Sequence, residues 1–225
     1  MSTFAIPAPK SPSTNLCDSA LSTICHPFIS AIETIREVHE YIESCSTITK
    51  LALTILAGAV VATICLPLNM AIGAIVVKCI SLAIGREKYD AISSETPLYN
   101  GKIPSAFTAC ILCPLVEEIA FRGILQPTTK ALVNFIVSPF FDKATAKKIA
   151  VIAAIVFTSL LFGALHFINS PNLLVSLPQV ICASFSGIIF GLEREFGGGL
   201  LESTAHHMTN NTIAWVLIQA LESAR

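Results

Sequence analysis

Apolar residues dominate the chain from residue 51 onward, and they occur in long unbroken runs rather than in alternation. The first run covers residues 51–84 and contains a single charge, Lys78. Further runs cover about 105–125, 149–168, 173–192 and 199–221. At about 1.5 Å per residue, each later run approaches the length needed to cross a bilayer as a helix, and the first is long enough for two crossings. The pattern predicts five or six membrane helices.

Polar segments and proline mark the expected ends of these helices. Pro67, Asn69 and Gly73 lie in the middle of the first run, and proline removes a backbone donor and disfavours helix in the residue before it. We therefore expect two spans there, followed by a loop over residues 86–104. The other expected breaks are the polar segments 142–148, 169–172 and 193–198.

The beginning of the chain has a different character. Residues 1–20 are rich in Ser, Thr and Pro, which predicts a mobile tail. Within residues 21–47, isoleucine and valine recur every three or four positions among acidic residues, which predicts an amphipathic helix on the membrane surface or against a bundle. We expect the N-terminal membrane spans and their loop over residues 48–104, and a core region over residues 105–225.

Composition supports a membrane protein with an all-α fold. Charged residues make up 13% of the chain and hydrophobic residues 53%, whereas soluble domains carry about 25% charged residues. Long runs without alternation favour helices over barrel strands, because backbone groups must be paired inside lipid. The net charge of −1 offers no basic face to nucleic acid. We expect a multi-pass protein with the lipid bilayer as its partner, in a bacterial inner membrane.

Three charges interrupt the run at 105–125: Glu117, Glu118 and Arg122. In a soluble helix they would be an ordinary surface salt bridge. In a membrane helix each charge costs about 2.5 to 3.5 kcal/mol on insertion scales, so they should face a protein interior or a water-filled cavity. Residues four apart share a helix face, so Glu118 is predicted to pair with Arg122. This pairing leaves Glu117 as the reactive carboxylate.

Two later runs each contain a histidine paired with another residue at the same spacing of four. These pairs are Phe162 with His166, and His207 with Asn211. Each pair projects from one face of its helix. A lone histidine on an apolar face is usually a satisfied core residue, but the three motifs together describe a site. The doubled sequence also contains His206 with Asn210 at the same spacing, and only one of the two pairs can face inward.

A carboxylate, two imidazoles and a carboxamide supply the parts of a hydrolytic centre. Glu117 can act as a general base toward water, and His166 can position that water or carry its proton. His207 and Asn211 can donate hydrogen bonds to a developing oxyanion. Glu117, His166 and His207 can also form a zinc site with one open position, although the HExxH pattern is absent. The sequence leaves zinc and a metal-free mechanism equally open.

The three motifs, in this order, resemble those of the type II CAAX prenyl protease and bacteriocin-processing family of intramembrane proteases. The similarity extends over about residues 105–215. It implies an endopeptidase of membrane-associated proteins or peptides, in which Glu117 activates water, His166 assists, and His207 with Asn211 forms the oxyanion site. Supporting roles are implied for three further side chains, Glu118, Arg122 and Phe162, while His206 with Asn210 stays an alternative register.

Two other classes of function are compatible with the same residues. The polar groups can form a structural network in a non-catalytic membrane scaffold or immunity protein related to the proteases. They can also relay protons in a proton-coupled transporter, for which inverted repeats would be expected. The apolar segments show no convincing internal repeat, so we favour the peptidase.

Overall fold

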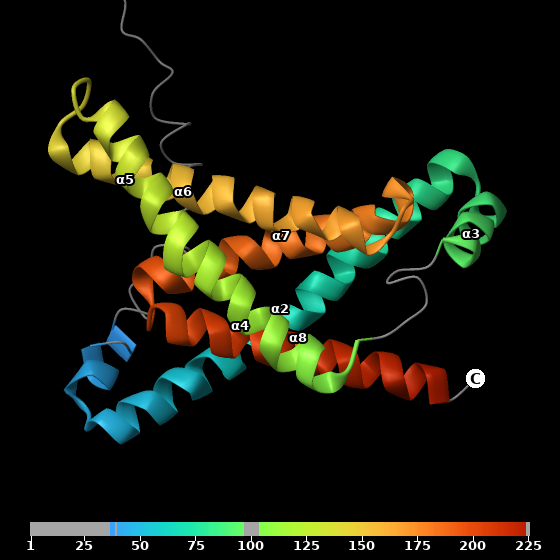
Figure 1. The fold of residues 1–225 in the computed structure, drawn as a ribbon, viewed down its shortest axis with the longest axis horizontal. Coiled ribbons are helices and arrows are strands. Elements are labelled where there is room, and N and C mark those ends of the chain that lie inside the picture. The colour runs from blue at the N-terminus through green and yellow to red at the C-terminus, as the bar shows by residue number, and fades with distance from the viewer. Residues whose placement is uncertain (1–36, 39, 97–103, 224–225) are drawn as a thin grey trace, which may run out of the picture.

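The computed structural model of the protein describes residues 37–38, 40–96 and 104–223. These residues form helices and turns and contain no strand (Figure 1). In chain order the helices are α2 (Thr47–Ile84), α3 (Arg86–Glu95), η2 (Thr108–Leu112), α4 (Cys113–Glu118), η3 (Ile119–Leu125), α5 (Gln126–Val137), α6 (Lys143–Leu165), η4 (His166–Asn169), α7 (Leu173–Phe196) and α8 (Leu200–Ser223). The predicted all-α fold is confirmed.

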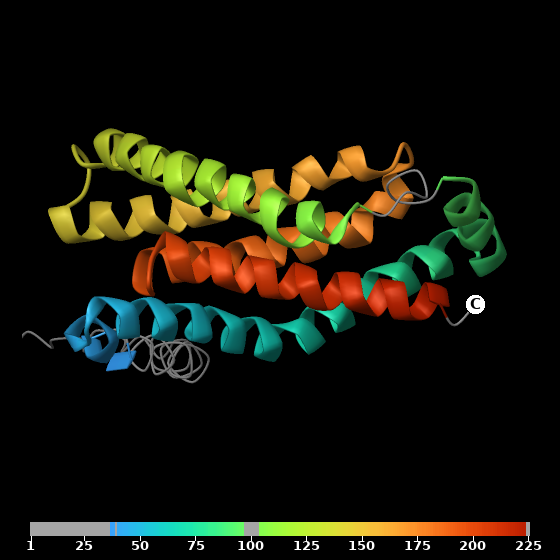
Figure 2. The same cartoon turned by 60° about the horizontal axis from the view of Figure 1, so that its bottom comes forward.

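The long helices form one bundle, in which α6, α7 and α8 run roughly alongside one another while α2 and the segment from α4 to α5 cross them obliquely (Figure 1; a second view is in Figure 2). α6 packs against α5 and α7, and α8 packs against α2 and α7. The helix that carries the acidic motif, α4, lies against α8. One sequence motif therefore comes from α4 with η3, one from the end of α6 and one from α8.

Apolar side chains cover much of the outside of this bundle. Within the part of the chain that the structure describes, three segments are long and apolar enough to cross a membrane: α2, residues Lys143–Asn169 (α6 with η4) and α7. In the most apolar part of each, no more than 39% is buried inside the protein, so most of these side chains need lipid around them. The protein is an integral membrane protein. The expected total of five or six spans stays a prediction.

The first apolar run folds as one helix, and the expectation of two spans separated by a break is wrong. α2 continues through Pro67, Asn69 and Gly73. One proline removes one backbone hydrogen bond, which a membrane helix packed against its neighbours tolerates. Asn69 Nδ2 donates to Ser186 Oγ at 2.6 Å, and the Asn69 carbonyl accepts from the Cys182 thiol at 3.4 Å. The hydrogen bonds of Asn69 therefore connect α2 to α7.

Several expected breaks have different limits in the structure. The expected loop over residues 86–104 begins with helix α3, which starts after Gly85 turns the chain at φ 91°. The break expected at 142–148 lies at 138–142, because α5 extends to Val137 and α6 already begins at Lys143. α7 likewise continues to Phe196. The sequence analysis placed these lysine and glutamate residues in loops because they are polar. Both residue types are good helix formers, so they can continue a helix beyond its apolar part.

The predicted N-terminal elements lie largely outside the described residues. The expected mobile tail, residues 1–20, is not described, nor is most of the expected amphipathic helix within 21–47. The described residues 37–38 and 40–44 are helical, and Ile42 is buried. The division into a membrane region over 48–104 and a core over 105–225 stays a prediction.

Asp142 caps the first turn of α6. Its carboxylate accepts hydrogen bonds from the N–H groups of Ala144 at 3.0 Å and Thr145 at 3.1 Å. Hydrogen bonds from the Thr145 hydroxyl and N–H, and from the Ala144 N–H, lower the pKa of Asp142 below its ordinary 3.8. The ionised cap therefore stabilises the fold above pH 3.8, and this contribution is lost as the pH falls through the lower pKa of the folded state.

We expect Asp142→Ala to lower the thermal unfolding midpoint of the detergent-purified protein at neutral pH. Asp142→Asn should lower the unfolding midpoint less, because asparagine caps helices about as well as aspartate does. Circular dichroism melts of the three proteins at pH 7 and in strong acid measure the effect, and the gap between wild type and Asp142→Ala should narrow in acid. Equal midpoints for wild type and Asp142→Ala at pH 7 would contradict the capping role.

Candidate active site

The two neighbouring glutamates lie in different surroundings. α4 carries both, and π-helical segments, η2 and η3, flank it on either side. Wide turns of this kind are common near functional sites, since they change the direction in which side chains point. The Glu118 side chain is fully buried, whereas 33% of the Glu117 side chain is exposed. Of the two carboxylates, only Glu117 is therefore exposed at the surface of the protein.

Arg122 holds Glu118 in the protein interior. Its Nη1 lies 3.3 Å from Glu118 Oε1, and both side chains are fully buried, which confirms the predicted pair. Arg122 Nη2 donates to the Gly187 carbonyl at 3.0 Å, and the guanidinium lies over the Phe162 ring at 4.6 Å from its centre. A buried charge is tolerated when it is paired and hydrogen-bonded. The Glu118 carboxylate therefore has a structural role, as the partner of Arg122.

His207 lies between the two carboxylates. Its Nδ1 is 3.2 Å from Glu118 Oε1, and its Nε2 is 3.6 Å from Glu117 Oε2. The ring stacks on Phe190, with centroids 4.8 Å apart and planes 24° from parallel. A carboxylate on one ring nitrogen fixes the orientation of the other. Glu118 therefore orients His207 so that Nε2 faces Glu117, a link that the sequence motifs alone do not predict.

His166 ends α6, where the helix tightens into η4. Its Nδ1 lies 2.9 Å from the Phe162 carbonyl oxygen. Because a carbonyl only accepts hydrogen bonds, the proton sits on Nδ1, and Nε2 has the lone pair. The Phe162 ring meets His166 edge-on at 5.1 Å between centroids and His207 at 5.6 Å. Phe162 therefore separates the two imidazoles by one aromatic ring.

Asn211 lies one turn along α8 from His207. Its Nδ2 donates to the Ala109 carbonyl at 3.1 Å, which joins α8 to η2. A carboxamide nitrogen carries two hydrogens, so this bond uses one donor and leaves the second for another acceptor.

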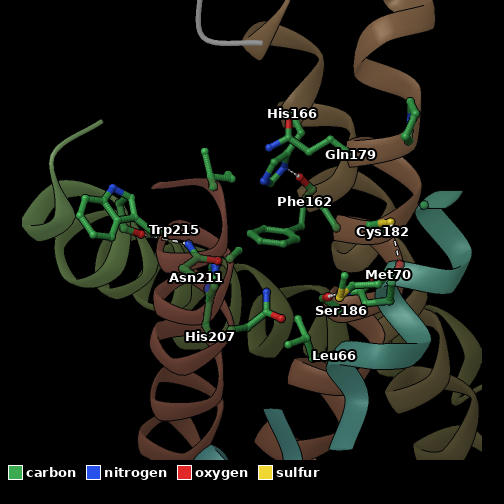
Figure 3. Close-up of a pocket in the computed structure, with 18 of the residues that line it drawn as sticks. Leu66, Met70, Phe162, His166, Gln179, Cys182, Ser186, His207, Asn211 and Trp215 are labelled. Carbon is green, nitrogen blue, oxygen red and sulfur yellow. Dashed lines mark hydrogen bonds between the residues drawn. The ribbon is translucent and has the colours of Figure 1, made fainter. Parts of the chain in front are cut away.

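A cavity of about 580 Å³ brings the histidine motifs together, within the range typical of ligand sites. Figure 3 shows His166, His207 and Asn211 around it, with Met70 of α2 on the opposite wall. Most of the lining is apolar. Glu117 does not line this cavity but borders it through His207.

Asn69 is a cavity residue that our sequence analysis assigned to a helix break. It lines the cavity from α2 and bonds to Ser186, and its Oδ1 is buried without a hydrogen-bond partner among the described residues. The signal was an amide side chain inside an otherwise apolar run, since polar residues at such positions usually face a cavity or a functional path.

The neighbouring histidines His206 and His207 lie in different environments. His207 lines the cavity together with Asn211. His206 is buried away from it, with Nδ1 2.8 Å from Glu193 Oε1 on α7. In the alternative pair, Asn210 does line the cavity but His206 does not. Our sequence analysis missed Glu193 because it follows an apolar run and reads as the start of a loop.

We expect His206→Ala to destabilise the protein by about 1 to 3 kcal/mol, the usual cost of leaving a buried polar group without its partner. The partner left behind is Glu193, which is 6% exposed. Urea unfolding in detergent measures the change. The double variant Glu193→Leu/His206→Leu removes both polar groups and should recover most of the loss. A single variant as stable as wild type would show that the contact contributes nothing.

Zinc binding by Glu117, His166 and His207, which the sequence leaves open beside a metal-free mechanism, stays a prediction. Among the residues that the structure describes, no three His, Cys, Asp or Glu side chains are grouped so that they could hold a metal ion. Glu117 and His207 face each other, while His166 lies on the other side of the Phe162 ring from His207. The bond from His166 Nδ1 to the Phe162 carbonyl leaves Nε2 free, as in many metal-bound histidines.

These features define a class of protein: a membrane-embedded helical bundle with a carboxylate and two imidazoles beside an internal cavity. The chain belongs to the Rce1-like type II CAAX prenyl endopeptidase family, whose model matches residues 99–213 and includes all three motifs. Neither the curated proteins nor the solved structures provide a match to the chain. The resemblance drawn from the motifs is confirmed, and the family is one of membrane CAAX protease-like hydrolases acting on membrane-associated peptides.

Proposed function

We propose that the protein is an intramembrane endopeptidase that hydrolyses a peptide bond of a membrane-associated protein or peptide, with Glu117 as the residue that activates water. One observation carries this proposal: two adjacent carboxylates have opposite surroundings. Arg122 and His207 both contact the buried Glu118, whereas Glu117 is partly exposed and lies 3.6 Å from His207 Nε2. A structural network needs a paired carboxylate such as Glu118 but has no use for an accessible second one.

Glu117 acts as the general base. It takes a proton from water while the water oxygen bonds to the carbonyl carbon of the substrate, and the carbonyl π electrons move to the oxygen. Positioned proton transfer of this kind contributes typically about 10² to 10⁴ in rate. The product of this step is a tetrahedral oxyanion.

Asn211 supplies one hydrogen-bond donor for that oxyanion. His207 supplies a second from Nε2 when its ring carries a proton on both nitrogens, because the Nδ1 proton is directed at the Glu118 carboxylate. The unused N–H of Asn211 and the Nε2 side of His207 belong to one face of α8 at the cavity. One such donor is worth about 2.7 to 4 kcal/mol in comparable sites. Because Glu118 and Arg122 fix the His207 ring, they act as positioning residues and do not touch substrate.

His166 completes the proton transfers. Its Nδ1 is held by the Phe162 carbonyl, so Nε2 can take the proton and deliver it to the leaving nitrogen. The carbon–nitrogen bond then breaks, which yields an amine and a carboxylic acid. Phe162 keeps the His166 ring in place by direct edge-on contact.

The family and the cavity together favour a substrate with a lipid-soluble segment. Apolar side chains of α2, including Leu66 and Met70, form the wall opposite the polar residues (Figure 3). Matched peptides with and without a prenylated C-terminal cysteine test this substrate class in the detergent-purified protein. A strong preference for the prenylated peptide assigns CAAX-type processing, and equal cleavage assigns a broader membrane peptidase.

The need for a metal is tested in the same assay. We propose the metal-free route, since the described residues hold no preformed three-ligand site. Activity should then survive prolonged treatment with a chelator. Loss of activity with the chelator and recovery with added zinc would replace this route with a zinc-dependent one, in which Glu117, His166 and His207 would have to rearrange.

A further inference from the structure

A second hollow lies between α5 and α6 and shares no lining residue with the cavity of the candidate active site. Its volume is about 290 Å³. Lys130 and Asn134 line it from α5, and Lys143 and Lys147 line it from α6. The remaining lining residues are proline and alanine. We call this hollow the lysine groove.

The lysine groove carries an excess of positive charge. Lys130 is neutralised by Glu195, with Nζ 2.7 Å from Oε2. Lys143 and Lys147 are one helical turn apart and share a face of α6, and neither forms an ion pair with the residues that the structure describes. The nearby Asp142 carboxylate is used by the first-turn N–H groups of α6. The ammonium groups of Lys143 and Lys147 therefore have no carboxylate within ion-pair distance among the described residues, and the groove keeps a net positive charge even when Asp142 and Glu195 are counted.

The lysine groove lies at the end of a membrane-crossing segment. Lys143 is the first residue of the apolar span that runs to Asn169, so the groove falls where the apolar part of the bilayer gives way to headgroups. The turn between α5 and α6 lies at one end of the bundle (Figures 1 and 2). Phe135 is 77% exposed on α5, and Phe140 is 78% exposed in the turn. These rings are suited to contact with acyl chains beside the groove.

We propose that the lysine groove binds the phosphate-bearing headgroup of an anionic phospholipid. Lys143 and Lys147 pair with the phosphate, and the Asn134 carboxamide can bond to headgroup oxygens. Basic hollows between membrane helices are known to bind anionic headgroups. The small volume suits a headgroup, with the acyl chains lying outside along the apolar surfaces of α5 and α6. A zwitterionic headgroup brings its own positive charge to the two lysines and is bound more weakly.

The test measures lipid binding to the full-length, detergent-purified protein by native mass spectrometry. Phosphatidylglycerol and phosphatidylcholine with identical acyl chains are titrated separately. The variants are Lys143→Gln/Lys147→Gln and, as a matched control, Lys148→Gln, which removes an exposed charge next to Lys147 that does not line the groove. Circular dichroism verifies that each variant is folded.

Each lysine near an anionic lipid is worth about fivefold in affinity, so the double variant should bind phosphatidylglycerol about 25-fold more weakly. Lys148→Gln should stay within about twofold of wild type, because its ammonium lies outside the groove. Equal binding of the two lipids by wild type would overturn the proposal. An equal loss in Lys148→Gln and the double variant would also overturn it, since it would show only diffuse surface charge.

Water-soluble glycerol phosphate separates a lipid from a free phosphate compound. It carries the same phosphate but has no acyl chains. For a lipid site, it should displace phosphatidylglycerol only at far higher concentration. Displacement at equal concentration would show that the groove binds soluble phosphate compounds and would contradict the lipid assignment. This test is independent of peptide cleavage.

Discussion

Glu117→Gln is expected to lower the rate of peptide hydrolysis by about two to four orders of magnitude, the usual contribution of a general base. Glutamine has the shape of glutamate but cannot take the proton of water. The substitution should leave the fold intact, because the Glu117 side chain is 33% exposed and, among the described residues, its one ion-pair contact is the 3.6 Å approach to His207. Initial rates on a cleavable peptide, with circular dichroism melts of the same samples, measure both effects.

Two comparisons make this result specific. Glu87→Gln removes an exposed glutamate on α3 and should change neither the rate nor the melt. Glu118→Gln changes the neighbouring carboxylate and should lower stability as well, because Arg122 and His207 both depend on it. If the folded Glu117→Gln protein keeps more than about a tenth of wild-type activity, Glu117 is not the base.

Arg122→Ala is expected to reduce the amount of folded protein severely. It leaves Glu118 charged and buried without its partner, a change that costs about 3 to 5 kcal/mol. Entire domains are stable by only about 5 to 15 kcal/mol. The loss also removes the bond to the Gly187 carbonyl and the contact with Phe162. The yield of monodisperse protein after detergent extraction, and its unfolding midpoint, measure the effect.

The matched control for this variant is Arg86→Ala. Arg86 also pairs with an acid four residues along, Asp90, but its side chain is 86% exposed, and exposed pairs contribute about 0 to 1 kcal/mol. Arg122→Met/Glu118→Leu replaces the buried pair with apolar groups and should regain folded protein while staying inactive, because His207 loses its orienting carboxylate. If Arg122→Ala behaves like Arg86→Ala, the buried pair is not a structural requirement.

Much of the fold was predictable because membrane helices produce long apolar runs in the sequence. The later runs correspond to η2 through η3, α6, α7 and α8, with ends shifted by up to six residues, whereas α5 (Gln126–Val137) lies outside every predicted run. The error at α2 has a physical cause: Pro67 weakens a helix locally, but packing against α7 through Asn69 and Ser186 stabilises it. The local pattern shows a polar residue inside an apolar run, but it does not show which distant residue that side chain contacts.

The site was predictable where its residues lie one turn apart. Glu118 with Arg122 follows directly from the spacing of four on a charged segment of an apolar helix. The link between Glu118 and His207 spans 89 positions of sequence, and no local rule predicts it. The choice between His206 and His207 also depends on a distant residue, Glu193, which faces only one of them.

The central claim is that this protein hydrolyses peptide bonds through Glu117. The most direct measurement is mass spectrometry of a broad peptide library, with prenylated and unprenylated members, after incubation with folded wild type or Glu117→Gln protein. The account predicts defined cleavage products with wild type and none above background with the variant. Equal products from both proteins, or none from folded wild type, would contradict it, and the second result would favour a non-catalytic scaffold.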